Sequence, residues 1–332
     1  MTDVLFLRSD ELAGLATPAE YVDAVRDGYE SYGTDGTAAP RTKLTNEEPP
    51  GMCTGYLAVL PSVGAMGGYT YAAGFGDGDV HFALPLFDAE SGRMIALLDG
   101  ASMNPHKTGA TGAVAVDALA REDATTCAVI GSGAQARGQL RATATVREFE
   151  TVQVFSPTLE SRQSFADEFD DRLAAAVSAV PSAADALDGA DVVITATRAS
   201  TPVFEDADLP DGAHVTAMGQ YDRGKYELPP ETVARSTYVP DLHDRAFQDA
   251  GAFLAARDAG LVDDDHIRAD LGDIVAGEAA GRTSDEAITV FDSGGTGVET
   301  VAAAWMLYEK AREAGLGERI EFAPGSEALT GE

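Results

Sequence analysis

The sequence predicts an α/β protein in which a doubly wound parallel sheet is joined to a smaller β-rich domain. The first observation is a short apolar run, 126–130, that ends in the glycine-rich stretch 131–136 and continues as a helix-like tail. The second is a series of further apolar strands at 151–155, 191–197 and 213–219, separated by helical or loop segments. These strands end in small residues, and such carboxyl-terminal tips form the ligand crevice of doubly wound sheets.

The stretch 131–136 has the pattern G-x-G-x-x-A, which is the fingerprint of a Rossmann dinucleotide-binding turn. Gly131 allows a tight turn, Gly133 lets the backbone approach a pyrophosphate, and Ala136 allows the helix to lie close to the strand. The phosphate would accept hydrogen bonds from the unpaired N–H groups of the helix N-terminus. A purely structural glycine turn is the alternative. The predicted dinucleotide site comprises Gly131, Ser132, Gly133, Ala134, Gln135, Ala136, Ser156, Thr158, Arg162, Thr195, Ala196, Thr197, Met218 and Gly219.

The end of the second strand bears on the choice between NADP and NAD as cofactor. A carboxylate at this position usually binds the ribose 2′-hydroxyl of NAD and repels a 2′-phosphate. Here no carboxylate occurs before Glu160, whereas Ser156 and Thr158 can bond either group and Arg162 can add positive charge. We therefore expect a preference for NADP(H). The alternative is that Arg162 faces water and that either cofactor binds.

Length and composition indicate a globular chain of two domains. The 332 residues suffice for two cores, and 45% of them are hydrophobic. No run approaches the roughly 18 apolar residues of a membrane span, and the N-terminus lacks a basic stretch followed by a long apolar one, so we expect a cytoplasmic protein without membrane binding. Cys53 and Cys127 are far apart, and the histidines lack metal-ligand spacing, so neither a disulfide nor a metal site is expected.

The charge pattern argues against a nucleic-acid partner. The net charge is -32, the acidic residues are dispersed, and only four lysines occur: Lys43, Lys107, Lys225 and Lys310. Dispersed acid with few lysines is expected of a protein kept soluble in high salt, where a Debye length of about 3 Å at 1 M screens self-repulsion. We infer a halophilic host.

The segment before the dinucleotide turn predicts a β-rich domain. Short β-like runs alternate with glycines at 55–75, and 84–99 has the pattern of a hairpin. Arg41 lies at a possible strand edge, and the alternative is a solvated arginine on an acidic surface. Lys107 precedes a small-residue helix at 111–121, where a cation is poorly placed against the macrodipole and so suggests an anionic partner; the alternative is an exposed lysine.

Several motifs occur in an order and at a spacing that resemble the ornithine cyclodeaminase/mu-crystallin family, which includes archaeal-type alanine dehydrogenases and ketimine reductases. The resemblance runs from about residue 38 to about residue 316. It rests on the motifs PRT, LFDAESGRMIALLDG, HKTGATGAVAVDALA, VIGSGAQA, SPTLESRQSFA, GADVVITAT and TVFDSGGTGVETVAAA.

The resemblance implies a homodimeric enzyme that transfers a hydride between NADP or NAD and a small amino, imino or keto acid. It implies that 1–115 together with 298–332 form the substrate-binding and dimerisation domain, completed by the C-terminal helix. Residues 116–297 then form the Rossmann domain. Alanine dehydrogenase or ketimine reductase activity is expected. The alternatives are an ornithine cyclodeaminase, which releases ammonia to form proline, and a family member that binds nucleotide without turnover.

The resemblance also assigns roles by position. Arg41 matches the family arginine that grips the substrate carboxylate, and Lys107 stands where the family's RTAA motif has arginine, near both cofactor and substrate. Ser293, Gly294 and Gly295 match the loop that closes over the nicotinamide. The sequence departs from the family in the strand around 68–71, where the family has a substrate-facing lysine and this chain has none.

Two tyrosines near the position of the missing lysine could take its place, and an aspartate is the candidate general base. Tyr69 and Tyr71 could donate hydrogen bonds in its place, although a tyrosine in a β-run is more often a packing residue. The family's catalytic aspartate aligns with Tyr221, and Asp222 follows it directly. Asp222 is therefore the candidate general base, and the alternative is a solvated aspartate in a turn.

Overall fold

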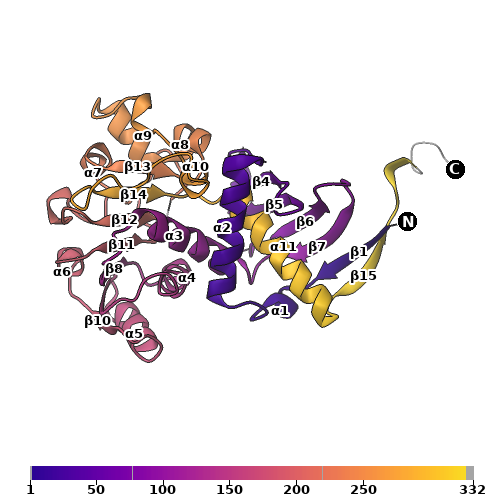
Figure 1. Ribbon diagram of the computed structural model, residues 1–332, viewed down its shortest axis with the longest axis horizontal. Helices are drawn as coiled ribbons and strands as arrows, with labels where there is room; N and C mark the ends of the chain where they lie inside the picture. Colours follow the sequence, from indigo (N-terminus) through magenta and orange to yellow (C-terminus); the bar gives the residue numbers. More distant parts are fainter. Residues whose placement is uncertain (1, 77, 219, 327–332) are drawn as a thin grey trace. The chain divides into compact units, whose positions relative to one another are not determined.

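The computed structural model describes residues 2–76, 78–218 and 220–326, and the chain divides into two compact units (Figure 1). The first unit comprises Met1–Asn104 with Thr296–Glu332, and the second comprises Pro105–Gly295. The sequence placed these boundaries at 115/116 and 297/298. The first difference arises from helix α3 (Asn104–Leu119), whose start at Asn104 corrects the expected start at 111. A proline in the first turn favours this earlier start, because its missing N–H would be unpaired there anyway.

The second unit is a parallel sheet with helices between its strands. Its elements are α3, β8 (Thr126–Ile130), α4 (Ala134–Thr143), β9 (Thr151–Phe155), α5 (Leu159–Asp170), β10 (Ala176–Ala179), α6 (Ala183–Leu187), β11 (Val192–Thr195), η1 (Asp206–Asp208), β12 (His214–Ala217), α7 (Pro230–Ala234), β13 (Thr237–Pro240), α8 (His243–Asp249), α9 (Gly251–Asp258), η2 (Asp264–His266), α10 (Leu271–Val275) and β14 (Thr289–Asp292). The strand order is β10-β9-β8-β11-β12-β14-β13, and every pairing is parallel.

Alternate residues of each strand bury their side chains on opposite faces of this sheet. Cys127 and Val129 of β8 lie in one hydrophobic cluster with residues of α3, α4 and α5. Ala128 and Ile130 of the same strand lie in a second cluster with residues of α6, α7, α8 and α9. Because successive side chains of a strand point to opposite faces, the two clusters mark two covered faces. The predicted doubly wound α/β fold is thus confirmed.

The first unit is built on a mostly antiparallel sheet of eight strands. Its elements are β1 (Thr2–Leu7), α1 (Ser9–Leu12), α2 (Pro18–Thr34), β2 (Thr37–Ala38), β3 (Thr42–Asn46), β4 (Gly51–Leu60), β5 (Ala65–Ala73), β6 (Ala83–Asp88), β7 (Met94–Asp99), α11 (Gly297–Ala314) and β15 (Glu318–Phe322). The order is β15-β1-β7-β6-β5-β4-β2, with β3 also paired to β4. The predicted hairpin is formed by β6 and β7.

Helix α11 covers one face of this sheet, and α2 lies against α11 (Figure 1). Glycines make the close approach possible. A Cβ atom on Gly297 would lie 2.3 Å from the backbone of Leu57 in β4, and one on Gly28 would lie 2.6 Å from the Cβ atom of Ala302. The returning C-terminal helix therefore completes the core of the first unit, as the resemblance implies.

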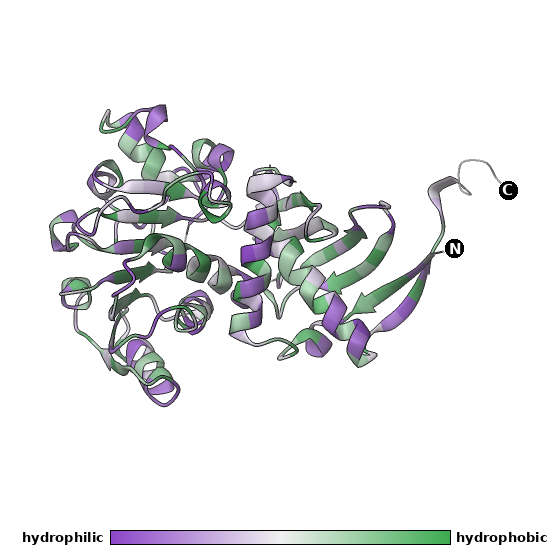
Figure 2. Ribbon diagram, in the orientation of Figure 1, coloured by the Kyte–Doolittle hydropathy of each residue, from purple (hydrophilic) through white to green (hydrophobic). Residues whose placement is uncertain are grey.

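Figure 2 shows the strands of both sheets largely in the hydrophobic colours, whereas outer helices such as α5 carry hydrophilic residues as well. Within the described ranges, no helix has the length and apolar character needed to cross a membrane.

Candidate cofactor site and two buried cations

The predicted cofactor residues lie at the carboxyl ends of adjacent strands in the second unit. Backbone hydrogen bonds continue the pairing just beyond these ends: the Gly131 N–H donates to the Phe155 carbonyl at 2.8 Å, and the Ala196 N–H to the Ile130 carbonyl at 3.0 Å. The Met218 N–H donates to the Thr195 carbonyl at 2.9 Å.

Gly219, the last of the predicted positions on this edge, lies outside the described residues. The strand order reverses between β8 and β11, and such a switch point is where doubly wound sheets bind dinucleotides.

The glycine-rich turn after β8 leaves a helix N-terminus open to an anion. Gly131 has φ 122°, and a Cβ atom there would lie 2.4 Å from the Ala196 carbonyl oxygen. Gly133 is exposed and caps α4 without a side-chain hydrogen bond, and a Cβ atom there would meet nothing within 4 Å. Ala136 is fully buried where helix and strand meet. The open space at Gly133 and the N–H groups of the first helical turn fit a pyrophosphate.

The residues predicted to bind the ribose lie together at the end of β9. The Ser132 hydroxyl donates to the Ser156 hydroxyl at 3.0 Å. Arg162 is half-buried; its Nη1 donates to the Ser156 carbonyl at 2.8 Å, and its guanidinium lies 5.7 Å from the centre of the Phe155 ring. Thr158, the N-cap of α5, is exposed. The guanidinium is therefore held at the strand end and not extended into water.

A buried carboxylate supports the end of β11, and the sequence reasoning missed it. Glu227 is 3% exposed; it accepts a hydrogen bond from the Thr197 N–H at 2.7 Å and another from the Thr195 hydroxyl at 3.2 Å. The available signal was the isolated acid in the run 225–228, followed at once by an apolar residue and two prolines. Glu227 therefore holds the backbone of Thr197 and the side chain of Thr195, two residues predicted to contact the cofactor.

Lys107 is only 1% exposed within α3, so the alternative of an exposed lysine is wrong. Helix α3 also packs tightly against α4. A Cβ atom on Gly109 would lie 2.2 Å from the Gly138 carbonyl oxygen, so the helices touch through glycine. A cation so close to a helix start remains opposed by the macrodipole.

Arg41 is also buried, at 6% exposed, so the solvated-arginine alternative is wrong. It lies between β2 and β3; its Nη1 donates to the Tyr71 hydroxyl at 2.9 Å, and its guanidinium lies 5.1 Å from the centre of the Tyr56 ring. Tyr69, by contrast, is fully buried and donates to the Gly100 carbonyl at 2.7 Å. Of the two candidate tyrosines, Tyr71 is therefore the one that bonds a predicted substrate-binding side chain.

Asp222 lies in a tight turn of the second unit. Its Oδ1 accepts from the Gly224 N–H at 3.0 Å, and a single β-bridge joins it to Lys225. This is the hydrogen bonding of a turn aspartate, which was the alternative to a general base. Asp222 is half-buried. Its catalytic role stays a prediction.

Ser293 and Gly295 follow β14 on the same edge of the sheet. The Ser293 N–H donates to the Ala217 carbonyl at 3.0 Å, which places this loop beside the end of β12. The buried Asp241, also missed by sequence reasoning, accepts hydrogen bonds from the loop. Its position directly after an apolar strand was the signal.

The sequence model of the ornithine cyclodeaminase/mu-crystallin family matches residues 51–315. This match includes the whole of the second unit, with its glycine-rich turn, and residues 51–104 and 296–315 of the first. The chain belongs to this family.

Family members with known activities are similar over most of this chain. A Delta(1)-pyrroline-2-carboxylate reductase of Bacillus cereus is 39% identical over 238 residues, covering 71% of this chain and 73% of the relative. The structure of the Thermococcus litoralis Delta(1)-pyrroline-2-carboxylate reductase, in complex with NADH and L-proline, has a TM-score of 0.88 at 30% identity, covering 96% and 100% of the two chains. An archaeal alanine dehydrogenase dimer with bound NAD has a TM-score of 0.89 at 28% identity, covering 97% and 100%.

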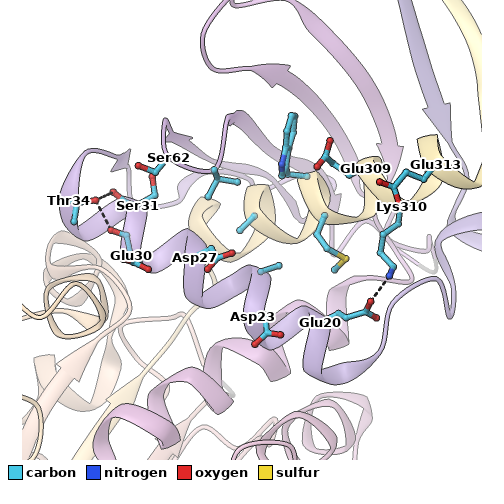
Figure 3. A pocket seen from close by; sticks show the side chains of 15 residues that line it. Glu20, Asp23, Asp27, Glu30, Ser31, Thr34, Ser62, Glu309, Lys310 and Glu313 are labelled. Atoms are coloured by element: carbon cyan, nitrogen blue, oxygen red, sulfur yellow. Dashed lines mark hydrogen bonds and ion pairs between the residues drawn. The ribbon is translucent and has the colours of Figure 1, made fainter.

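The first unit of this family member also has a groove of about 670 Å3 between α2 and α11 (Figure 3). Trp305 and Met306 line it, but most of its polar side chains are carboxylates. The ion pair with Lys310 lowers the pKa of Glu20 to about 2. Such a lining repels a carboxylate substrate or a phosphate, so we do not assign either to this groove. The carboxylates are those of Glu20, Asp23, Asp27, Glu30, Glu309 and Glu313.

No group of three His, Cys, Asp or Glu that could hold a metal occurs in the described part of the chain.

Proposed function

We propose that this chain reduces a small cyclic α-imino acid with NAD(P)H, and that Δ1-pyrroline-2-carboxylate is the substrate to test first. The chain is an NAD(P)-dependent oxidoreductase of the imino acid reductase type. The observation that carries the proposal is the open glycine turn at the switch point of the second unit, in a chain 39% identical to a reductase of this substrate. Two buried cations support an anionic substrate.

The reduced nicotinamide, when bound, supplies the hydride that reduces the imine carbon. The chain's own residues bind the substrate and control protons. Arg41 can grip the carboxylate through its planar guanidinium, while Lys107 adds a point charge. Asp222 is the proposed group that holds or moves the proton of the substrate nitrogen. Glu227 holds the end of β11, whose residues would contact the cofactor.

A substrate panel tests the proposal. Purified protein in molar salt is mixed with NADH or NADPH and either Δ1-pyrroline-2-carboxylate, pyruvate with ammonia, or Δ1-pyrroline, which lacks the carboxylate. Loss of reduced-cofactor absorbance is expected with the first compound and not with the last. Rapid turnover of pyruvate with ammonia alone would indicate an alanine dehydrogenase instead. In a separate incubation with ornithine and NAD+, formation of proline and ammonia would indicate a cyclodeaminase. Binding of cofactor without any turnover would indicate a non-catalytic member.

We also propose that the chain forms a homodimer through the open face of the first unit's sheet. Leu44 is 67% exposed and Leu57 60% exposed, and they border an apolar groove of about 290 Å3. Antiparallel sheets usually turn a polar face to water, so exposed leucines mark a contact surface. Light scattering should give twice the chain mass, and Leu57→Asp should give the chain mass. A wild-type monomer would exclude this dimer.

A cytoplasmic location in a halophilic host remains part of the proposal. Its support is the dispersed negative charge of the sequence.

A further inference from the structure

The loop that follows β14 is held by one buried carboxylate. Asp241 directly follows β13 and is fully buried. Its Oδ2 accepts hydrogen bonds from the Ser293 hydroxyl at 2.7 Å, from the Gly294 N–H at 2.9 Å and from the Gly295 N–H at 3.2 Å. Three consecutive residues of the loop therefore donate to the same oxygen. Gly295 has φ 87°, a left-handed conformation that glycine adopts without strain.

A buried arginine holds this carboxylate in turn. Arg245 of α8 is 1% exposed, and its Nε donates to Asp241. Its Nη2 donates to the Asp292 carbonyl at 2.7 Å and to the Asp292 carboxylate at 2.6 Å, and its Nη1 to Asp249 at 3.2 Å. Asp292 is the last residue of β14, so one guanidinium fixes both the carboxylate that binds the loop and the strand from which the loop departs.

The location of this network connects it to the cofactor. In doubly wound sheets, each half of the dinucleotide lies over the strand ends on one side of the switch point. The glycine-rich turn and the Ser156 region occupy the β8–β9 side. The ends of β12 and β14 lie on the other side. By this rule the half of the dinucleotide that carries the nicotinamide would lie on the side of the loop.

We propose that Asp241 and Arg245 are positioning residues that fix the Ser293–Gly295 backbone against the nicotinamide. This proposal rests on the proposed function. Ionised side chains are costly to bury, and apolar residues would join a strand to a helix equally well. Apolar residues cannot, however, accept hydrogen bonds from consecutive backbone N–H groups. The network therefore determines the shape of the loop, which bears on hydride transfer and not only on stability.

The same sheet provides a matched control at its opposite end. Asp191, at the start of β11, accepts from the Thr125 N–H at 2.8 Å and the Thr126 N–H at 2.9 Å, and it also pairs with Arg121. It is thus another carboxylate that joins an arginine to backbone N–H groups. Because it lies at the amino ends of the strands, it is remote from the cofactor edge.

The experiment compares Asp241→Asn with Asp191→Asn in the full-length protein. An amide keeps the shape of the carboxylate but removes its charge and one acceptor atom. Wild-type activity is established first with the substrate panel, because its absence would refute the proposed function without testing the network. We expect Asp241→Asn to lower kcat by about 100-fold, as misplacement of reacting groups by about 1 Å can do. Asp191→Asn should keep kcat within about twofold of wild type.

Two readouts do not depend on turnover. Hydrogen exchange in the protein without cofactor should be faster at Gly294 and Gly295 in Asp241→Asn and unchanged there in Asp191→Asn. Fluorescence of bound NADH should lose anisotropy in Asp241→Asn, because a less restrained nicotinamide rotates more freely. If Asp241→Asn does not fold, Ser293→Ala removes one of the three bonds and should show the same effects at smaller size. Equal kcat and equal exchange in both aspartate variants would overturn the proposal.

Discussion

Gly131 and Gly133 differ in what surrounds the position of a Cβ atom. Gly131 has a positive φ and a carbonyl in the place of a Cβ atom, whereas Gly133 has open space. We predict that Gly133→Val abolishes NAD(P)H binding, because the branched side chain would occupy the pyrophosphate position, and that it leaves the melting temperature nearly unchanged. Cofactor titration by fluorescence checks this, and Gly131→Val is the contrast, expected to lose stability as well. Undiminished binding by Gly133→Val would show that the cofactor binds elsewhere.

The burial of Arg41 excludes a solvated surface arginine and leaves substrate binding as the role to test. If it binds the substrate carboxylate, Arg41→Ala should raise KM by about tenfold to 100-fold, which corresponds to ~1.5–3 kcal/mol for a charge-assisted hydrogen bond. Tyr71→Phe is the matched control: it removes the hydroxyl that bonds Arg41 but keeps the ring, which lies 4.8 Å from Phe82. We expect a smaller rise in KM for Tyr71→Phe. Unchanged kinetics in Arg41→Ala would leave the arginine a structural residue.

At the scale of elements, we expect the end of β9 and the first turn of α5 to determine the choice between NADPH and NADH. Arg162 is held at this end by the Ser156 carbonyl, and no carboxylate occupies the strand tip. We predict that NADPH binds more tightly than NADH, and that Arg162→Ala weakens NADPH binding by about tenfold, the loss of one charge-assisted contact. NADH binding should barely change. Tighter binding of NADH by the wild type would contradict the preference.

Strand β12 carries a buried histidine that makes the second unit sensitive to acid. Nδ1 of His214 lies 2.9 Å from the Thr289 hydroxyl and Nε2 lies 3.0 Å from the Thr216 hydroxyl, and burial lowers its pKa from 6.5 to about 3. Below pH 6.5 the unfolded chain therefore binds a proton that the folded chain does not. The free energy of unfolding consequently decreases as the pH is lowered.

Through His214, the free energy of unfolding should decrease by about 2 kcal/mol between pH 7 and pH 5. Denaturant unfolding at several pH values measures it. His214→Gln should flatten this dependence, whereas the same change at the exposed His81 should leave it as in the wild type. A wild-type profile identical to that of His214→Gln would contradict the buried neutral imidazole.

At the scale of the whole molecule, a net charge of -32 makes stability depend on salt. Burial, followed by repulsion from Glu30 and Asp23, raises the pKa of Asp27 in the α2–α11 groove. We predict that the melting temperature rises between 0.1 M and 2 M KCl. The Debye length is only about 3 Å at 1 M salt, so the repulsion between the carboxylates is screened. Asp27→Asn should raise it at 0.1 M and have less effect at 2 M. A melting temperature independent of salt would argue against a halophilic host.

Sequence patterns alone predict the doubly wound sheet, the bounds of β8 and β9, and the place of the glycine-rich turn. These features depend on local order: apolar runs, glycine spacing and the alternation of strand and helix are properties of neighbouring residues. The family followed from motifs in a fixed order. The start of α3 was wrong because the helical signal of a Pro-His-Lys segment is weak until the packing of Gly109 on Gly138 is known.

The burial of charged side chains, by contrast, could be learned only from the folded chain. Glu227 and Arg245 look like ordinary surface residues in so acidic a sequence, and a solvated side chain was the alternative for Arg41 and Lys107. Each of the four is nevertheless nearly inaccessible. Burial depends on partners distant in the chain, such as Tyr71 for Arg41 or the 293–295 loop for Asp241. A charge leaves water only where such partners compensate its desolvation, and that compensation is a property of the folded arrangement.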